Sequence, residues 1–126
     1  MLSFLRKFAA VSGFLAVALG AFAAHGLKAK LSEYGADIWQ TAVFYQFIHT
    51  LLLVFVVSNS AFVEKCRRET QRLGVMLASG IVIFSGSLYL IALTGISKLG
   101  MITPIGGVLF LFAWLYLIKL FNAVKD

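Results

Sequence analysis

The sequence predicts an all-α integral membrane protein, a four-helix bundle that forms a single domain over residues 1–126. Hydrophobic residues make up 61% of the chain and charged residues only 13%, whereas soluble domains are about half apolar and about a quarter charged. Uncharged runs cover residues 8–27, 38–63, 73–97 and 99–118, and about 20 apolar residues cross a hydrocarbon core of about 30 Å. We therefore expect membrane spans at about 8–25, 40–63, 73–95 and 103–120.

The distribution of lysine and arginine predicts the orientation of these spans. With four spans, both termini and the middle loop share one side, which carries eight basic residues: Arg6, Lys7, Lys65, Arg67, Arg68, Arg72, Lys119 and Lys125. The other side carries three: Lys28, Lys30 and Lys98. Because basic residues stay on the cytoplasmic side, we expect both termini in the cytoplasm. The net charge of +6 then reflects topology and contact with membrane lipid headgroups, and we expect no nucleic-acid partner.

The first span, at about 8–25, has one competing interpretation, a cleaved signal peptide. Arg6 and Lys7 resemble a basic leader start, and the small residues at 21–23 resemble a cleavage site. The uncharged run continues to Leu27, which is longer than the usual apolar region of about 7–15 residues in a signal peptide. We therefore favour a retained first span.

Small residues within the spans predict where helices pack closely. In the first span they recur every four residues, and glycines lie in the third and fourth spans: Ser12, Ala16, Gly20, Ala24, Gly86, Gly106 and Gly107. Such residues let helix backbones approach each other in lipid. The pattern is compatible with packing inside one bundle, with a homo-oligomer, and with contact to another membrane protein.

The segment between the first two spans has its own apolar stripe. Leu27, Leu31, Tyr34 and Ile38 are spaced by four, three and four residues, which predicts a short interfacial helix. Gly35 weakens this prediction. Trp39 follows where an aromatic belt is expected and opens the second span.

The remaining elements follow from charge and turn signals. The second span runs to about residue 63, and the charged residues 64–72 form the cytoplasmic loop. The third span starts near Leu73, and residues 94–100 make a short external turn. Thr103 is expected to cap the fourth helix, with Pro104 as its first helical residue.

Polar side chains at membrane depth are the candidate ligand-contact residues. They are His25, Trp39, Tyr45, Gln46, His49, Ser85, Tyr89 and Thr103. His49 lies ten residues after Trp39, about 15 Å deep and near the midplane. His25 lies at the outer end of the first helix, where we expect it to clamp the corner with the second. The two histidines are too far apart to share a metal, the spans contain no acidic residue and the chain has one cysteine; we expect no metal and no cofactor.

Four ordered motifs carry a family resemblance: "GAFAAHGLK" at 20–28, "WQTAVFYQFIHTLLL" at 39–53, "FSGSLYLIALTG" at 84–95 and "MITPIGGVLFLFAW" at 101–114. With these motifs the chain resembles the bacterial inner-membrane family called domain of unknown function 423, which has a eukaryotic relative in transmembrane protein 256. The resemblance implies a small four-helix protein of the bacterial inner membrane with no established activity. It carries over no catalytic residues.

Three classes of function are compatible with these observations. We favour a structural or accessory membrane protein that packs with itself, a partner or lipid, and we do not expect an enzyme. The alternative is a small oligomeric transporter or channel-like protein, for which His49 and Gln46 would serve as pathway residues. An enzyme acting on a lipid or quinone at the outer leaflet, with His25, Tyr45 and Tyr89, is ranked lowest.

Overall fold

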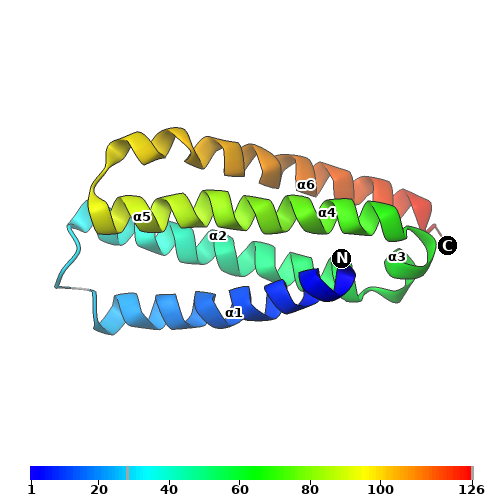
Figure 1. Ribbon diagram of the computed structural model, residues 1–126, viewed down its shortest axis with the longest axis horizontal. Helices are drawn as coiled ribbons and strands as arrows, with labels where there is room; N and C mark the ends of the chain where they lie inside the picture. Colours follow the sequence, from blue (N-terminus) through cyan, green and yellow to red (C-terminus); the bar gives the residue numbers. More distant parts are fainter. Residues whose placement is uncertain (28, 126) are drawn as a thin grey trace.

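The computed structural model describes residues 1–27 and 29–125, and it is an antiparallel bundle of four long helical stretches (Figure 1). Its elements are α1 (Leu2–His25), α2 (Glu33–Ser58), α3 (Ser60–Lys65), α4 (Arg67–Gly80), a π-helical segment (Ile81–Ser85), α5 (Gly86–Thr94), a 3₁₀ turn (Ser97–Met101) and α6 (Thr103–Ala123). Four stretches are long and apolar enough to cross a membrane: Leu2–His25, Glu33–Ser58, Arg67–Thr94 and Ser97–Ala123. The predicted all-α, four-span fold is confirmed.

The predicted interfacial helix before the second span does not form as a separate element. Residues 29–31 are turn and bend, and α2 already starts at Glu33 because the Ser32 hydroxyl accepts a hydrogen bond from the Gly35 amide at 2.9 Å. This N-cap satisfies one of the free amides of the first turn. Trp39 therefore lies inside α2 rather than at its start. Lys28, part of the same predicted segment, lies outside the described residues.

The second span is shorter than predicted because Asn59 ends it. α2 stops at Ser58, and the Asn59 side chain caps α3 by accepting a hydrogen bond from the Phe62 amide at 3.0 Å. The Arg6 side chain donates to the Val57 carbonyl at 3.0 Å, so a basic residue of α1 satisfies the last turn of α2. The loop expected at 64–72 is largely helical, since α3 and α4 meet at Cys66.

The third and fourth spans also differ from the prediction at their ends. The third begins at Arg67 and ends at Thr94, where Gly95 adopts a φ of +72° that suits glycine. α6 begins at Thr103, with Pro104 in its first turn, but the Thr103 hydroxyl does not cap the helix. It instead pairs with the Ser87 hydroxyl at 2.5 Å and so joins α6 to α5.

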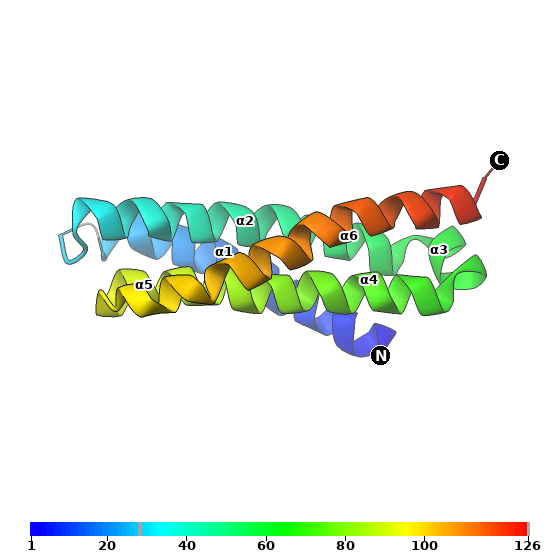
Figure 2. The same cartoon turned by 90° about the horizontal axis from the view of Figure 1, so that it is seen from above.

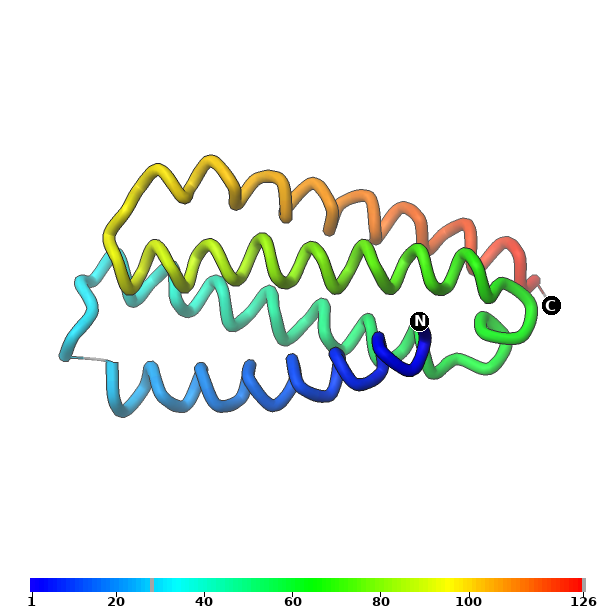
Figure 3. The backbone as a smooth tube through the Cα atoms, viewed as in Figure 1, coloured from blue at the N-terminus to red at the C-terminus, as the bar shows by residue number. Residues whose placement is uncertain are grey.

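The main hydrophobic core lies at the end of the bundle that holds both termini and α3 (Figure 1, Figure 3). It is formed by Leu2, Leu5, Ala9, Leu53, Val56, Val57, Phe62, Leu73, Leu77, Ala78, Ala113, Leu117 and Leu120. A smaller core of Ala42, Leu88 and Ile91 lies at the opposite end. The polar side chains at membrane depth lie between the two.

Small residues of α1 face α2 only in part. Ser12 and Ala16 are buried, and a Cβ at Gly20 would lie 3.3 Å from Val43 of α2. Ala24 is exposed and lies outside this contact. The four-residue ridge therefore packs over its first three members.

The closest backbone approach in the molecule is between α6 and the π-helical segment, where α6 runs obliquely across the third span (Figure 2). A Cβ at Gly106 would lie 2.5 Å from the Phe84 nitrogen, and one at Gly80 would lie 2.6 Å from the Phe110 ring. Gly107 lies at ordinary contact distance from the Phe84 ring. Gly86, expected at a helix contact, has no atom within 4 Å of its Cβ position, so the structure places it outside the packed interface.

Candidate functional site

Gln46 is the centre of a buried hydrogen-bond network that joins three spans. Its Nε2 donates to the Ser12 carbonyl of α1 at 2.9 Å, and its Oε1 accepts from the Tyr89 hydroxyl of α5 at 2.6 Å. The Ser12 hydroxyl also pairs with the Thr50 hydroxyl of α2 at 2.7 Å. Gln46 is only 4% exposed, so this amide joins α1, α2 and α5 in an environment where unpaired polar groups are costly.

Two further bonds extend this network along α2. The Trp39 indole donates to the Leu19 carbonyl of α1 at 3.0 Å, and the Ser85 hydroxyl donates to the Ala42 carbonyl of α2 at 2.8 Å. The Trp39 ring also meets the Tyr89 ring edge-on, with centroids 4.7 Å apart. Side chains of α2 and of the third span thus bond backbone carbonyls of the neighbouring helix directly.

His49 forms a second cluster, on the side of α2 that faces α6. Its Nδ1 lies 2.7 Å from the Tyr45 carbonyl, and its Nε2 accepts from the Trp114 indole at 3.1 Å. Because a carbonyl only accepts and an indole N–H only donates, the imidazole is neutral with its proton on Nδ1. The ring stacks on Phe110, with centroids 3.6 Å apart. Both ring nitrogens are occupied, which leaves neither for a metal ion.

A membrane-facing groove lies between α1 and the third span, directly over the Gln46 network. It encloses about 260 Å³, and it is lined by Phe8, Val11, Ser12, Leu15, Leu19, Gln46, Ile81, Val82, Ser85, Gly86 and Tyr89. Val11, Leu15 and Val82 are exposed on its rim. The walls are apolar and the polar groups at the floor already bond one another, so the groove suits an apolar chain better than a hydrated solute.

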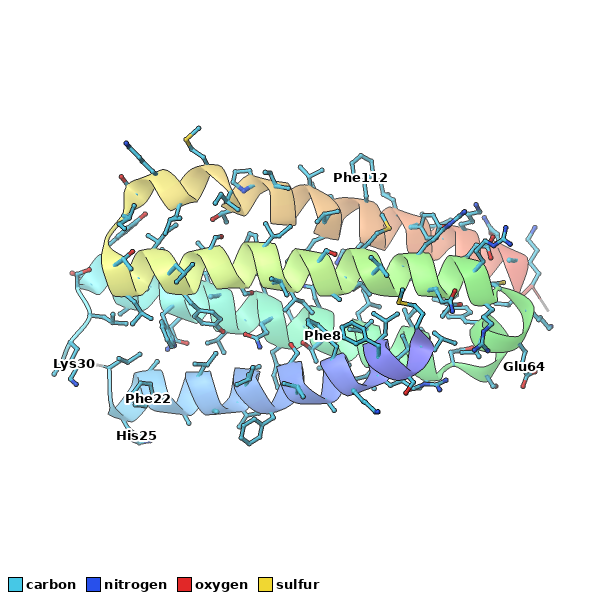
Figure 4. The ribbon with its side chains drawn as sticks, viewed as in Figure 1. Phe8, Phe22, His25, Lys30, Glu64 and Phe112 are labelled. Carbon is cyan, nitrogen blue, oxygen red and sulfur yellow. The ribbon has the colours of Figure 1, made fainter. Side chains whose placement is uncertain are left out.

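His25 takes no part in either cluster. It lies in the last turn of α1 as predicted, but its side chain is exposed and points away from the bundle (Figure 4). The expected clamp on the corner between the first two spans is therefore not formed by this imidazole. The corner is shaped instead by Gly26, where a Cβ would lie 2.6 Å from the Phe22 ring.

The arrangement of the motif residues agrees with a comparison of the whole chain with known families. The sequence model described as "Protein of unknown function (DUF423)" matches residues 19–107. This chain belongs to the DUF423 family.

Relatives of this DUF423 protein cover almost its full length. A UPF0382 membrane protein of Staphylococcus aureus is 42% identical over 111 residues, which are 86% of this chain and 87% of the relative. A UPF0382 membrane protein of Staphylococcus epidermidis is 45% identical over 86% of this chain and 87% of its own length. The UPF0382 membrane protein YwdK of Bacillus subtilis is 43% identical over 86% of this chain and 88% of its own length. No solved structure matches the chain.

In this DUF423 protein the predicted site residues separate into three groups. Trp39, Gln46, Ser85 and Tyr89 lie in the network under the groove. His49 and Tyr45 lie in the aromatic cluster against α6, where the Tyr45 and His49 rings stack with centroids 5.9 Å apart. Thr103 pairs with Ser87 away from both clusters, and His25 stands alone.

The sequence-based prediction missed several partners in the DUF423 chain. Thr50, Ser87, Phe110 and Trp114 were not among the candidates, and Ser12 was assigned to packing alone, yet all five contact predicted residues. Spacing gave a weak signal for some of them, because Thr50 follows Gln46 by four residues and Trp114 follows Phe110 by four. Residues at that spacing share a helix face. The helices on which their partners lie were not given by spacing.

Proposed function

We propose that this protein is a non-enzymatic accessory protein of the bacterial inner membrane, a stable four-span bundle that acts by lateral association with lipid or with another membrane component. The observation that supports this proposal most strongly is how the polar groups at membrane depth are used. Ser12, Gln46, His49, Thr50 and Ser85 are each buried and hydrogen-bonded to another residue. Such groups hold helices together in lipid.

The same use of polar groups argues against solute transport as the main activity. A transport pathway needs polar groups that exchange partners with water or with the solute. Gln46 and His49, the two residues best suited to that role, have side-chain atoms bonded to Ser12, Tyr89, Tyr45 and Trp114. A moving solute would have to break these bonds.

Localisation and orientation are part of the proposal. The relatives are named membrane proteins of Staphylococcus and Bacillus, which supports a bacterial plasma membrane. The end of the bundle that holds both termini and α3 (Figure 1) carries eight of the eleven lysines and arginines. The positive-inside rule therefore supports a cytoplasmic position for that end.

The proposal is tested by site-specific photocrosslinking in cells, combined with flux measurements. A photoreactive phenylalanine analogue replaces Leu15 or Val82 at the groove, and Leu111 or Phe112 on exposed faces of α6 serves as the matched control. We expect the groove positions to give discrete adducts, with lipid, with a second copy or with a membrane protein, at several times the control yield. Similar yields at all four positions would count against an association site at the groove.

The transporter alternative gives the opposite outcome in liposomes. For an accessory protein, purified protein in sealed vesicles releases neither protons, potassium nor small dyes faster than empty vesicles. A flux that appears with the wild type and disappears with His49→Ala, at equal protein incorporation, would replace our proposal with the transporter.

A further inference from the structure

A second hollow, at the end of the bundle that carries both termini, is lined by basic side chains. It encloses about 520 Å³, and it is lined by Met1, Arg68, Gln71, Arg72, Val75, Met76 and Tyr116. Arg68 and Arg72 are one helical turn apart on α4, so both guanidinium groups lie on one face. Both are exposed, and their side chains are free to close around an anion. We call this hollow the basic groove.

The basic groove also contains a hydrogen-bonding group that has no partner. The Tyr116 hydroxyl of α6 is buried and makes no hydrogen bond within residues 1–27 and 29–125. Buried hydroxyls are nearly always paired, so this group has a hydrogen bond to give to a ligand. The Lys119 ammonium lies 5.4 Å from the centroid of the Tyr116 ring and adds a third cation beside the groove.

The lining of the basic groove changes from charged to apolar along α4. Arg68, Gln71 and Arg72 come first, and Val75 and Met76 follow one turn deeper toward the membrane. This order matches a lipid, in which a charged headgroup sits at the interface above an apolar chain.

The apolar part continues as a series of hollows between α1 and the third span. The basic groove shares Met1 and Val75 with the next hollow, which shares Phe4, Ala78 and Ser79 with a third. The third shares Phe8 and Val82 with the groove over Gln46. From Met76 to Tyr89 the helix rises about 20 Å at 1.5 Å per residue, which exceeds the roughly 15 Å depth of one leaflet.

We propose that the basic groove binds a phosphate-bearing membrane lipid. Arg68 and Arg72 hold the phosphate, since guanidinium groups form paired, charge-assisted hydrogen bonds with phosphate oxygens. Gln71 and the Tyr116 hydroxyl donate further hydrogen bonds, and one acyl chain follows the hollows between α1 and the third span. The ligand is a lipid rather than free phosphate because the apolar hollows begin directly below the arginines. This inference goes beyond the proposed function and does not depend on it.

The test is native mass spectrometry of delipidated protein in detergent, titrated separately with phosphatidylglycerol, with diacylglycerol of the same chains and with inorganic phosphate. We expect one phosphatidylglycerol to be retained at concentrations where the other two are not. The double variant R68Q/R72Q should lower its affinity by about tenfold or more. The matched control K65Q/R67Q removes the same charge at the same end but outside the groove, and it should retain wild-type affinity.

The variant Y116F tests the site without changing any charge. It removes only the unpaired hydroxyl, so the thermal stability of the lipid-free protein should be unchanged or raised while phosphatidylglycerol binds about threefold more weakly. Equal losses in R68Q/R72Q and K65Q/R67Q would show general charge attraction and overturn the site. Wild-type affinity in both R68Q/R72Q and Y116F would also overturn it, and equally strong retention of inorganic phosphate would replace the lipid by a small anion.

Discussion

At the scale of single residues, Gln46 has the most partners of any side chain at membrane depth. Its amide bonds α1 through the Ser12 carbonyl and α5 through the Tyr89 hydroxyl. Neither partner is close to Gln46 in sequence, so the side chain links spans that hydrophobic contact alone would leave free to slide. Interhelical hydrogen bonds in membranes contribute about 0.6 kcal/mol on average and at most about 2 kcal/mol.

We expect Gln46→Leu to lower the free energy of unfolding by about 1–2 kcal/mol, because it leaves the Tyr89 hydroxyl without its acceptor. Tyr89→Phe should cost less, and the double variant should cost no more than Gln46→Leu alone, because both changes remove the same bond. Denaturation in mixed detergent micelles measures all three. Gln40→Leu, at an exposed position of α2, is the control and should be nearly neutral; an equal loss in this variant would contradict the role of the network.

The two histidines should respond oppositely to substitution. His25→Ala should change stability by less than about 0.5 kcal/mol, because the side chain is exposed. His49→Ala should cost about 2–4 kcal/mol, since it removes the stack on Phe110 and the acceptor of the Trp114 indole. Thermal melting in detergent compares them, with tryptophan fluorescence to report on Trp114. A large loss of stability in His25→Ala would restore the corner clamp.

At the scale of elements, the crossing of α6 over the third span depends on one glycine. Gly106→Ala places a methyl group 2.5 Å from the Phe84 nitrogen, which forces the helices apart and should cost about 2–3 kcal/mol. Gly86→Ala is the matched control, because its Cβ position is empty and alanine is the better helix former by about 1 kcal/mol. Melting temperatures should therefore fall in the first variant and rise or stay level in the second. Equal behaviour would mean that the two helices are not in backbone contact.

The number of elements could be predicted from the sequence, but several of their ends could not. Hydropathy reports the length of an apolar run and gives no information about breaks within it. It therefore missed Asn59, which ends α2 inside an apolar run and caps α3. The stripe from Leu27 to Ile38 fits helical periodicity, yet Ser32 starts α2 within it by capping. The π-helical segment at Ile81–Ser85 leaves no pattern in the sequence.

The candidate site was predictable by residue type and not by partner. Polar residues at membrane depth are few, so most of those that matter could be named, including Gln46, His49 and Tyr89. Their pairing depends on the register between helices, which one sequence does not contain. Trp114 illustrates this, because its neighbour Lys119 suggests the interface, whereas its indole bonds His49 at 3.1 Å in the bundle interior.

At the scale of the whole molecule, α1 is part of the core and we expect it to be retained. Leu2, Leu5 and Ala9 are buried in the main core, and cleavage near residue 23 would uncover their partners. N-terminal sequencing of the membrane-extracted protein should therefore find Met1 or Leu2, and a start near Ala24 would support the signal peptide. Fusions of a cytoplasm-active fluorescent reporter at either terminus should both fluoresce; a dark fusion at both ends would invert the topology.

The neutral, doubly bonded imidazole of His49 has a consequence for how the protein responds to an energised membrane. Each elementary charge that crosses the bilayer experiences about 2.3 kcal/mol per 100 mV. The uncharged runs 8–27, 38–63, 73–97 and 99–118 hold no Asp, Glu, Lys or Arg, and His49 carries no extra proton while Trp114 donates to it. Voltage therefore finds no charge to move within the bundle. The same conformation should persist in respiring and de-energised cells, which sets this protein apart from membrane proteins that sense voltage.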